Sequence, residues 1–279
     1  MNLIERRTTT LPALRFLEAP RAGSTLLLVH GVCRRAEDFD MLWEKLLPQT
    51  NVVAIDQRGH GDSERASRYL VTDYVTDAIR FLQNRAEPAF IMGHSLGAMV
   101  AAAVAAELPE LVRGIVLEDP PFHTMGRNIH GSAWQAQFVG MRDAALMARS
   151  VEQLIDMLAE VRLPQPDGGV KRMGDIRDRP NLLWSAQCLA KLDPQVLTSI
   201  IEGSWLEGYD IPDVFRAIRC PALLLQADPR AGGAMAHTDA RLCEDAIAKC
   251  RIIRFPKAGH LLHRQQPAVI AGLVNELVS

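Results

Sequence analysis

The chain contains a serine between two glycines, Gly93-His94-Ser95-Leu96-Gly97, in the G-x-S-x-G pattern of a nucleophile elbow. The short apolar run at residues 90–92 suits a buried strand, and the alanine-rich run at residues 96–107 favours a helix. A serine at such a strand-to-helix turn exposes its hydroxyl above the sheet, beside helix amides that can stabilise negative charge. The pattern therefore predicts nucleophilic catalysis by Ser95. The alternative is a structural turn whose serine only caps the helix.

Apolar segments with the length of buried strands alternate with helical segments along the chain. Because these strands are apolar throughout, the order predicts an α/β fold with a mostly parallel, doubly wound sheet. Ligands bind such sheets at the carboxyl ends of the strands, and His30, Asp56, Ser95, Asp119 and His260 each follow a predicted strand. The predicted strands are residues 25–29, 52–55, 90–92, 115–117, 222–225 and 251–255, and the predicted helices are residues 38–47, 74–85, 96–107, 239–248 and 267–278.

The alternation stops over roughly ninety residues in the second half of the chain, where helical patterns occur without a convincing strand. Asp193-Pro194 has the capping side chain and the early proline of a helix start, and proline and glycine predict a loop at residues 164–169. We expect a helical cap inserted after the strand that ends near Leu117; a separate helical domain without a part in the site is the alternative. The predicted division is residues 1–119 and 213–279 for the core and residues 120–212 for the cap.

Composition excludes several classes of partner. The 279 residues carry a net charge of −2, so there is no basic stripe for nucleic acid and no polybasic membrane anchor. The first seven residues lack an apolar signal core, and no apolar run approaches the ~20 residues of a membrane span. Five scattered cysteines favour free thiols over a disulfide framework or a metal site. These features predict a cytoplasmic protein with a small-molecule substrate, and they leave the oligomeric state open.

Four motifs in their order along the chain resemble those of the α/β-hydrolase superfamily. They are His30-Gly31, the run Asp56-Gln57-Arg58-Gly59-His60-Gly61-Asp62-Ser63, the elbow at Ser95, and Gly259-His260 after the last predicted strand. The resemblance covers residues 25–122 and 218–279 and leaves out the cap. It implies the α/β-hydrolase fold, a serine-nucleophile enzyme of the branch with a helical cap, and no cofactor.

The resemblance also implies roles for the histidines. His260 stands where the family places the general base that a serine hydroxyl needs, and His263 is close enough to be an alternative. His30 and His60 belong to structural motifs and are expected to hold loops by hydrogen bonds. His94, next to the serine on the elbow, is interpreted as a packing residue.

The acid that orients the base has three candidates. The family usually places it a few residues beyond the strand at residues 222–225, but that position holds Arg230, and Asp228 lies two residues early. Some members, including haloalkane dehalogenases and zearalenone-lactonase-like enzymes, carry it after the preceding strand, where Asp119 matches. Two prolines after Asp119 would fix the loop, as a rigid carboxylate requires. Asp119 is therefore favoured, with Asp228 and Glu118 as alternatives.

The resemblance implies an oxyanion hole made by the backbone amides of Val32 and Leu96. Arg58 and the residues after it are interpreted as a loop beneath the site, and Asp73, Asp77 and Arg80, at helical spacing, as a solvated face. Nothing in the sequence around Cys33 would activate its thiol. The side chains that could line a substrate pocket, or equally pack within the cap, are Cys33, Phe122, Trp134 and Trp184.

The favoured function is hydrolysis of a carboxylic ester or lactone through an acyl-enzyme formed on Ser95. Cofactor-independent dioxygenases and carbon–carbon bond hydrolases resemble the same architecture, and Asp119 does not separate them from esterases. A non-catalytic ligand receptor is a third hypothesis, disfavoured because every member of the triad has a candidate. The substrate itself cannot be predicted, because the cap that would shape the pocket resembles nothing specific.

Overall fold

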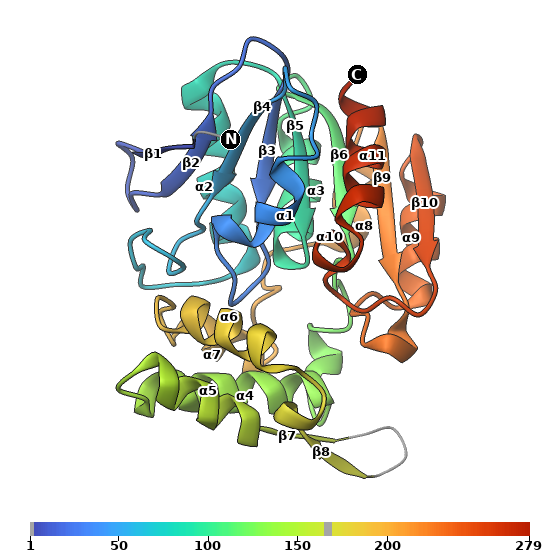
Figure 1. The fold of residues 1–279 in the computed structure, drawn as a ribbon. Coiled ribbons are helices and arrows are strands. Elements are labelled where there is room, and N and C mark those ends of the chain that lie inside the picture. The colour runs from blue at the N-terminus through green and yellow to red at the C-terminus, as the bar shows by residue number, and fades with distance from the viewer. Residues whose placement is uncertain (1–2, 165–168) are drawn as a thin grey trace.

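The computed structural model describes residues 3–164 and 169–279. Within them eight strands form one sheet in the order β1-β2-β4-β3-β5-β6-β9-β10, with parallel pairing from β4 to β10 (Figure 1). The predicted mostly parallel, doubly wound sheet is confirmed. The strands are β1 (Ile4–Arg7), β2 (Arg15–Ala19), β3 (Thr25–Val29), β4 (Asn51–Ile55), β5 (Ala89–His94), β6 (Val112–Glu118), β9 (Ala222–Ala227) and β10 (Cys250–Phe255).

Helices cover both faces of the sheet, which explains why its central strands are apolar throughout. In β3, Leu27 and Val29 belong to one hydrophobic core and Leu26 and Leu28 to a second, because side chains alternate between the faces of a strand. The helices on the first face are α2 (Val71–Arg85), α3 (Leu96–Glu107), α8 (Ile211–Ala217) and α9 (His237–Ala246); those on the second are α1 (Asp40–Trp43), α10 (Leu262–Gln265) and α11 (Pro267–Val278).

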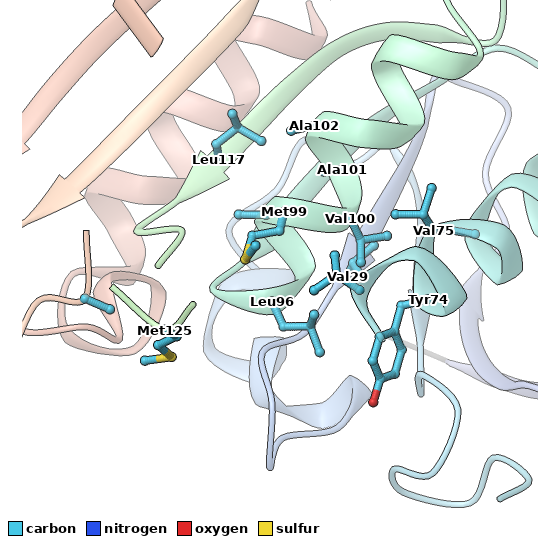
Figure 2. Close-up of a cluster of buried hydrophobic side chains, with 14 of the residues drawn as sticks. Val29, Tyr74, Val75, Leu96, Met99, Val100, Ala101, Ala102, Leu117 and Met125 are labelled. Carbon is cyan, nitrogen blue, oxygen red and sulfur yellow. The ribbon is translucent and has the colours of Figure 1, made fainter. Parts of the chain in front are cut away.

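Helix α3 packs in one hydrophobic core with Val29 and Leu117 of the strands and with Tyr74 of α2 (Figure 2). The approach is close because glycines flank the turn before it. A Cβ atom on Gly93 would lie 2.0 Å from the carbonyl oxygen of Gly97, and one on Gly97 would lie 1.9 Å from that of Val29. Backbone packing therefore requires both glycines of the elbow.

The edge strands β1 and β2 were not predicted, and they pair antiparallel with their neighbours. All five residues of β2 are buried although two are charged. Arg15 bonds Asp56 at 3.1 Å, and Glu18 bonds Arg85 at 2.7 Å. Buried charges are tolerated when they are paired, so this strand lacks the apolar pattern by which the others are recognised.

The solvated face expected on α2 is wrong for two of its three residues. Asp73 and Asp77 are each only 7% exposed. Arg58 donates two hydrogen bonds to Asp77, at 2.6 and 2.7 Å, and Arg68 donates to Asp73 at 2.7 Å. Arg80 is exposed, as expected. These ion pairs fix the loop after β4 on α2, which sequence spacing within the helix alone could not reveal.

The segment between β6 and β9 forms a helical layer at one end of the sheet (Figure 1). It contains a short hairpin, β7 (Arg162–Pro164) with β8 (Val170–Arg172), so the expectation of no strand there is wrong. Of the loop expected at residues 164–169, residues 165–168 lie outside the described residues. The division into core and cap remains a prediction. The helices of this layer are α4 (Ala133–Met147), α5 (Val151–Glu160), α6 (Arg179–Leu189) and α7 (Val196–Ile201).

Three of these helices begin with a capping side chain. Asp193 connects the layer to the segment between β4 and α2. Its amide donates to the carbonyl oxygen of Gly59 at 2.8 Å, and its carboxylate accepts from the Tyr69 hydroxyl at 2.8 Å. Helix α7 begins at Val196 with Gln195 as its N-cap and without a capping side chain, so the predicted helix start at Asp193-Pro194 is two residues early and the pair instead anchors the turn before α7. The helix caps, each accepting a backbone hydrogen bond, are Ser132, Ser150 and Asp178.

All five cysteines are free thiols, as composition led us to expect. In the part of the chain that the structure describes, no helix combines the length and apolar character that crossing a membrane requires.

Candidate active site

Ser95 occupies the sharp turn between β5 and α3. Its backbone has φ 54° and ψ −117°, a conformation that costs a non-glycine residue ~1–3 kcal/mol. The Ser95 amide donates to the carbonyl oxygen of Glu118 at 2.8 Å, which fastens the turn to the end of β6. Its hydroxyl is buried and has no hydrogen-bond partner among the described residues. The turn therefore holds a hydroxyl that no protein group has engaged.

Asp119, the first residue after β6, contacts His260 from the far end of the chain. Its Oδ2 lies 2.6 Å from Nδ1 of His260. The carboxylate is fully buried and also accepts from the backbone amides of Ala227, Ala234 and Met235 at 3.1, 2.7 and 3.3 Å. A carboxylate can only accept from Nδ1–H, so Nε2 of the neutral ring is left as the atom that can take a proton.

The other acid candidates lie elsewhere. Asp228 caps the short 3-10 helix Pro229–Ala231 and accepts from the amides of Arg230 and Lys257 at 2.9 and 3.0 Å. Glu118 contacts His263 rather than His260. Of the three acids, the structure therefore brings only Asp119 to His260.

His94 does more than the packing expected of it. Its Nε2–H donates to the backbone carbonyl oxygen of His260 at 3.0 Å, and the two rings are 4.6 Å apart between centroids. Burial lowers the pKa of His94 well below its ordinary value, and the charges of His260 and His263 act in the same direction. A neutral His94 thus holds the His260 loop beside the elbow. Its place next to Ser95 was the one sequence signal for this role.

His263 lies in a buried row with two carboxylates. Nδ1 is 2.8 Å from Glu118 Oε1, and Nε2 is 3.2 Å from Asp38 Oδ2. Burial alone would lower the pKa of His263, but the charges of Glu118 and Asp38 outweigh it and raise the pKa to about 9. Both ring nitrogens therefore donate, and His263 is not free to act as a base. Sequence spacing could not reveal a row assembled from three distant segments.

His94, Glu118 and His263 also bring ligand-type atoms within 4.8 Å of one another. A histidine binds a metal through an unprotonated ring nitrogen, whereas both ring nitrogens of His263 donate to carboxylates. The geometry is thus that of a charge network rather than of a metal centre.

The row makes stability depend on pH in a defined direction. His263 binds its proton more tightly in the folded protein, where its pKa is raised to about 9, than in the unfolded chain, where the pKa is about 6.5. Its contribution is fully present below pH ~6.5 and is lost as the pH rises through ~9. We expect the free energy of unfolding to lose ~3 kcal/mol on this account, and His263→Gln to lack that component. Urea titrations of both proteins across pH 6–10 measure the difference; parallel pH profiles would contradict the assignment.

The loop after β3 lies directly beside the serine. A Cβ atom on Gly31 would lie 3.1 Å from Cβ of Ser95. His30 donates from Nδ1 to the carbonyl oxygen of Gly31 at 2.7 Å and accepts from the Gln57 amide at 3.0 Å. Burial lowers the pKa of His30 to about 4, so the ring is neutral, as these two bonds require. His60 likewise bonds the carbonyl oxygen of Arg58 at 2.9 Å. The expected loop-holding hydrogen bonds of both histidines are confirmed.

The amides of Val32 and Leu96 flank this corner. Across residues 3–164 and 169–279, neither amide donates a hydrogen bond to a protein group. Cys33, which follows Val32, is buried, and burial raises the pKa of its thiol to about 12. A thiol protonated at neutral pH is a poor nucleophile.

The aromatic residues expected to line a pocket occupy three different places. Trp134 of α4 meets the His260 ring edge to face, with centroids 5.4 Å apart. Trp184 of α6 donates from Nε1 to Asp38 at 2.7 Å. Phe122 is fully buried against Phe215 and packs in the core. Only Trp134 contacts one of the candidate catalytic side chains.

Comparison with known proteins gives the same family over most of the chain. The model of the family described as "Alpha/beta hydrolase family" matches residues 26–273. A 2-(acetamidomethylene)succinate hydrolase from Mesorhizobium japonicum is 35% identical over 100 residues, which are 35% of this chain and only 36% of that relative.

Solved structures share the fold at low identity. The crystal structure of E-2-(acetamidomethylene)succinate hydrolase superposes with a TM-score of 0.74 at 20% identity, covering 99% of each chain. That of the enol-lactonase from Burkholderia xenovorans LB400 does so with a TM-score of 0.73 at 16% identity, covering 98% of this chain and 99% of the other.

Proposed function

Since the chain belongs to the alpha/beta hydrolase family, we propose that it is a serine hydrolase that cleaves a carboxylic ester or lactone through an acyl-enzyme. The observation that carries this proposal is the 2.6 Å contact between Asp119 and His260 at the sheet edge where Ser95 forms the strained turn. A nucleophile, a base and an orienting acid from separate segments are what acyl transfer requires.

In the first half of the reaction, Nε2 of His260 takes the proton from Ser95 as Oγ attacks the substrate carbonyl carbon. Asp119 holds the ring in the required tautomer and stabilises the imidazolium that forms. The Val32 and Leu96 amides donate to the oxygen that becomes negatively charged. The bond to the leaving alcohol breaks as His260 returns its proton to that oxygen, and the acyl group stays on Ser95.

In the second half, water replaces the alcohol. His260 takes a proton from the water as it attacks the acyl carbon, and then returns it to Ser95 as the acid leaves. In a lactone the alcohol and the acid belong to one molecule, so the product is a single hydroxy acid. The same residues serve both substrates.

Labelling with a fluorophosphonate tests the proposal directly. The probe phosphonylates a serine whose hydroxyl is activated by a base, so we expect one adduct per chain, mapped by peptide mass spectrometry to Ser95. Ser67→Ala, at an exposed serine, should label as the wild type does. A protein that hydrolyses esters while Ser95 stays unlabelled would contradict the proposal.

The rival reactions on this fold give different readouts. A cofactor-independent dioxygenase would consume oxygen with a heteroaromatic substrate. A carbon–carbon hydrolase would cleave a diketone faster than an ester. A ligand receptor would bind small molecules without turnover. The presence of a serine at the strained elbow favours acyl transfer over the oxygenase, which needs only the histidine and the acid.

A further inference from the structure

Arg177, in the segment that leads into α6, is a cation without an anionic partner. Among the described residues no carboxylate oxygen lies within 4.0 Å of it, and its guanidinium donates to the neutral side chain of Gln137 at 3.0 Å. The side chain is partly buried, and an unpaired charge is costly away from water. Burial lowers the pKa of Arg177 to about 10, and the charge of Arg34 acts in the same direction.

Arg34 brings a second positive charge to the same place. It follows the loop of Val32, and its amide closes a turn onto the carbonyl oxygen of Gly31 at 3.2 Å. Its side chain is 12% exposed, and its nearest carboxylate oxygen, on Asp38, is 4.0 Å away. That carboxylate already accepts from His263 and Trp184, so Arg34 is only partly neutralised.

Both guanidinium groups act on one residue of the loop that follows β3, which lies beside the serine. Each acts on the Cys33 thiol, where its charge opposes the rise in pKa that burial causes. Gln137, which accepts from Arg177, stands one helical turn after Trp134 on α4, and Trp134 contacts His260. Arg34 therefore extends from the turn that begins beside Ser95, and Arg177 contacts the helix that carries Trp134.

We propose that Arg34 and Arg177 bind a carboxylate of the substrate, so that the enzyme acts on esters or lactones that carry a free acid group. The hydrolysis of such a substrate rests on the proposed function. The binding of its carboxylate by the two arginines does not depend on that function. Guanidinium groups match planar oxyanions with paired hydrogen bonds. Asp38 also faces His263 and Arg264 and offsets only part of the Arg34 charge, so between one and two positive charges of the two guanidinium groups are left without a partner. A carboxylate supplies one negative charge to this pair.

The experiment compares two esters of similar length, p-nitrophenyl hydrogen succinate, which carries a free carboxylate, and p-nitrophenyl butyrate, which is neutral. We expect the wild type to have the higher kcat/KM with the succinate ester. Arg177→Gln should lower the ratio of the two kcat/KM values by a factor of ~10–100, the worth of a hydrogen bond to a charged group. Arg179→Gln, at an exposed arginine two residues away, is the matched control and should leave the ratio unchanged.

A second experiment measures ligand binding by a variant that cannot turn over the substrate. Succinate should bind the Ser95→Ala protein in calorimetry more tightly than phosphate does, and adding Arg177→Gln should weaken it. If neither ester is cleaved but succinate still binds through Arg177, the proposed reaction fails and this inference stands. If Arg177→Gln unfolds the protein, Arg177→Lys keeps the charge and should keep part of the preference. An unchanged ratio, an equal loss with both esters, or no binding of succinate would overturn the inference.

Discussion

Replacing Ser95 with alanine is expected to lower kcat for a short p-nitrophenyl ester by a factor of roughly 10⁴–10⁶. The hydroxyl is the only described group at the elbow that can form the acyl-enzyme, and without it His260 and Asp119 have no nucleophile to activate. What remains would be hydrolysis by water helped by substrate binding and the two amide donors. Initial rates at saturating ester, with the stopped reaction checked for acyl-enzyme, measure the loss.

The variant should fold normally, since the Ser95 hydroxyl makes no hydrogen bond with a described residue. A melting temperature near that of the wild type would show this. Ser67→Ala, at an exposed serine, controls for loss of a hydroxyl as such. Substantial activity in folded Ser95→Ala would exclude the acyl-enzyme mechanism altogether.

Asp119→Asn is expected to cut kcat by a factor on the order of 10³–10⁴. Oδ1 of Asp119 accepts from two backbone amides, those of Ala227 and Met235, so the asparagine oxygen would take that place and its NH₂ group would take the place of Oδ2 beside His260. Nδ1 would then have to accept a hydrogen bond, which places the ring proton on Nε2, where it blocks removal of the serine proton. The amide also offers no charge to the imidazolium.

Asp228→Asn is the matched control. Its carboxylate accepts from two backbone amides and does not contact His260, so we expect less than about a tenfold loss, within the range of a surface substitution of ~1 kcal/mol. Parallel kcat measurements on the two variants decide between the aspartates. A larger loss in Asp228→Asn than in Asp119→Asn would mean that the acid has been assigned wrongly.

Apolar runs were sufficient to predict the strands inside the parallel sheet, because all or nearly all of their residues are buried. Strand β10, at the edge of the sheet, exposes Arg251 and Arg254. Strand β3, Thr25–Val29, has the same bounds in the prediction and in the structure. The helix after the elbow, Leu96–Glu107, also has the predicted bounds. Its alanines are both strong helix formers and small enough for close packing on the sheet.

Two of the failures, on β2 and on α2, share one physical cause, which is pairing between residues far apart in the chain. Arg15 in β2 is buried because Asp56 neutralises it, and Asp77 in α2 is buried because Arg58 does. A local pattern assigns a charged side chain to solvent, since it contains no information about a partner. The β7–β8 hairpin was missed for a different reason, because its two strands have only three residues each.

Some residues of the candidate site could be predicted from the sequence, and others were identified only from the fold. The motif selected Ser95 and the resemblance to the family selected His260, and both catalytic roles stay predictions. Residue type and position alone could not separate Asp119 from Asp228, because β6 and β9 are neighbours and both end at the same edge of the sheet. The resemblance and the two prolines favoured Asp119. The row of Glu118, His263 and Asp38 and the pair of Arg34 and Arg177 came only from the fold.

The adjacency of β6 and β9 has a consequence in polymer terms. The connection between these two hydrogen-bonded strands contains 103 residues, from 119 to 221. A crossover connection that contains a helix needs only ~10–12 residues. Loop-closure entropy grows with the logarithm of loop length, so this roughly tenfold excess costs the sheet only ~2 kcal/mol. The inserted layer can therefore lengthen, shorten or change its side chains over evolution at little expense to the strands that carry Ser95. Changes in this layer could therefore alter the proposed substrate preference without changing the strands and turns that position Ser95, Asp119 and His260.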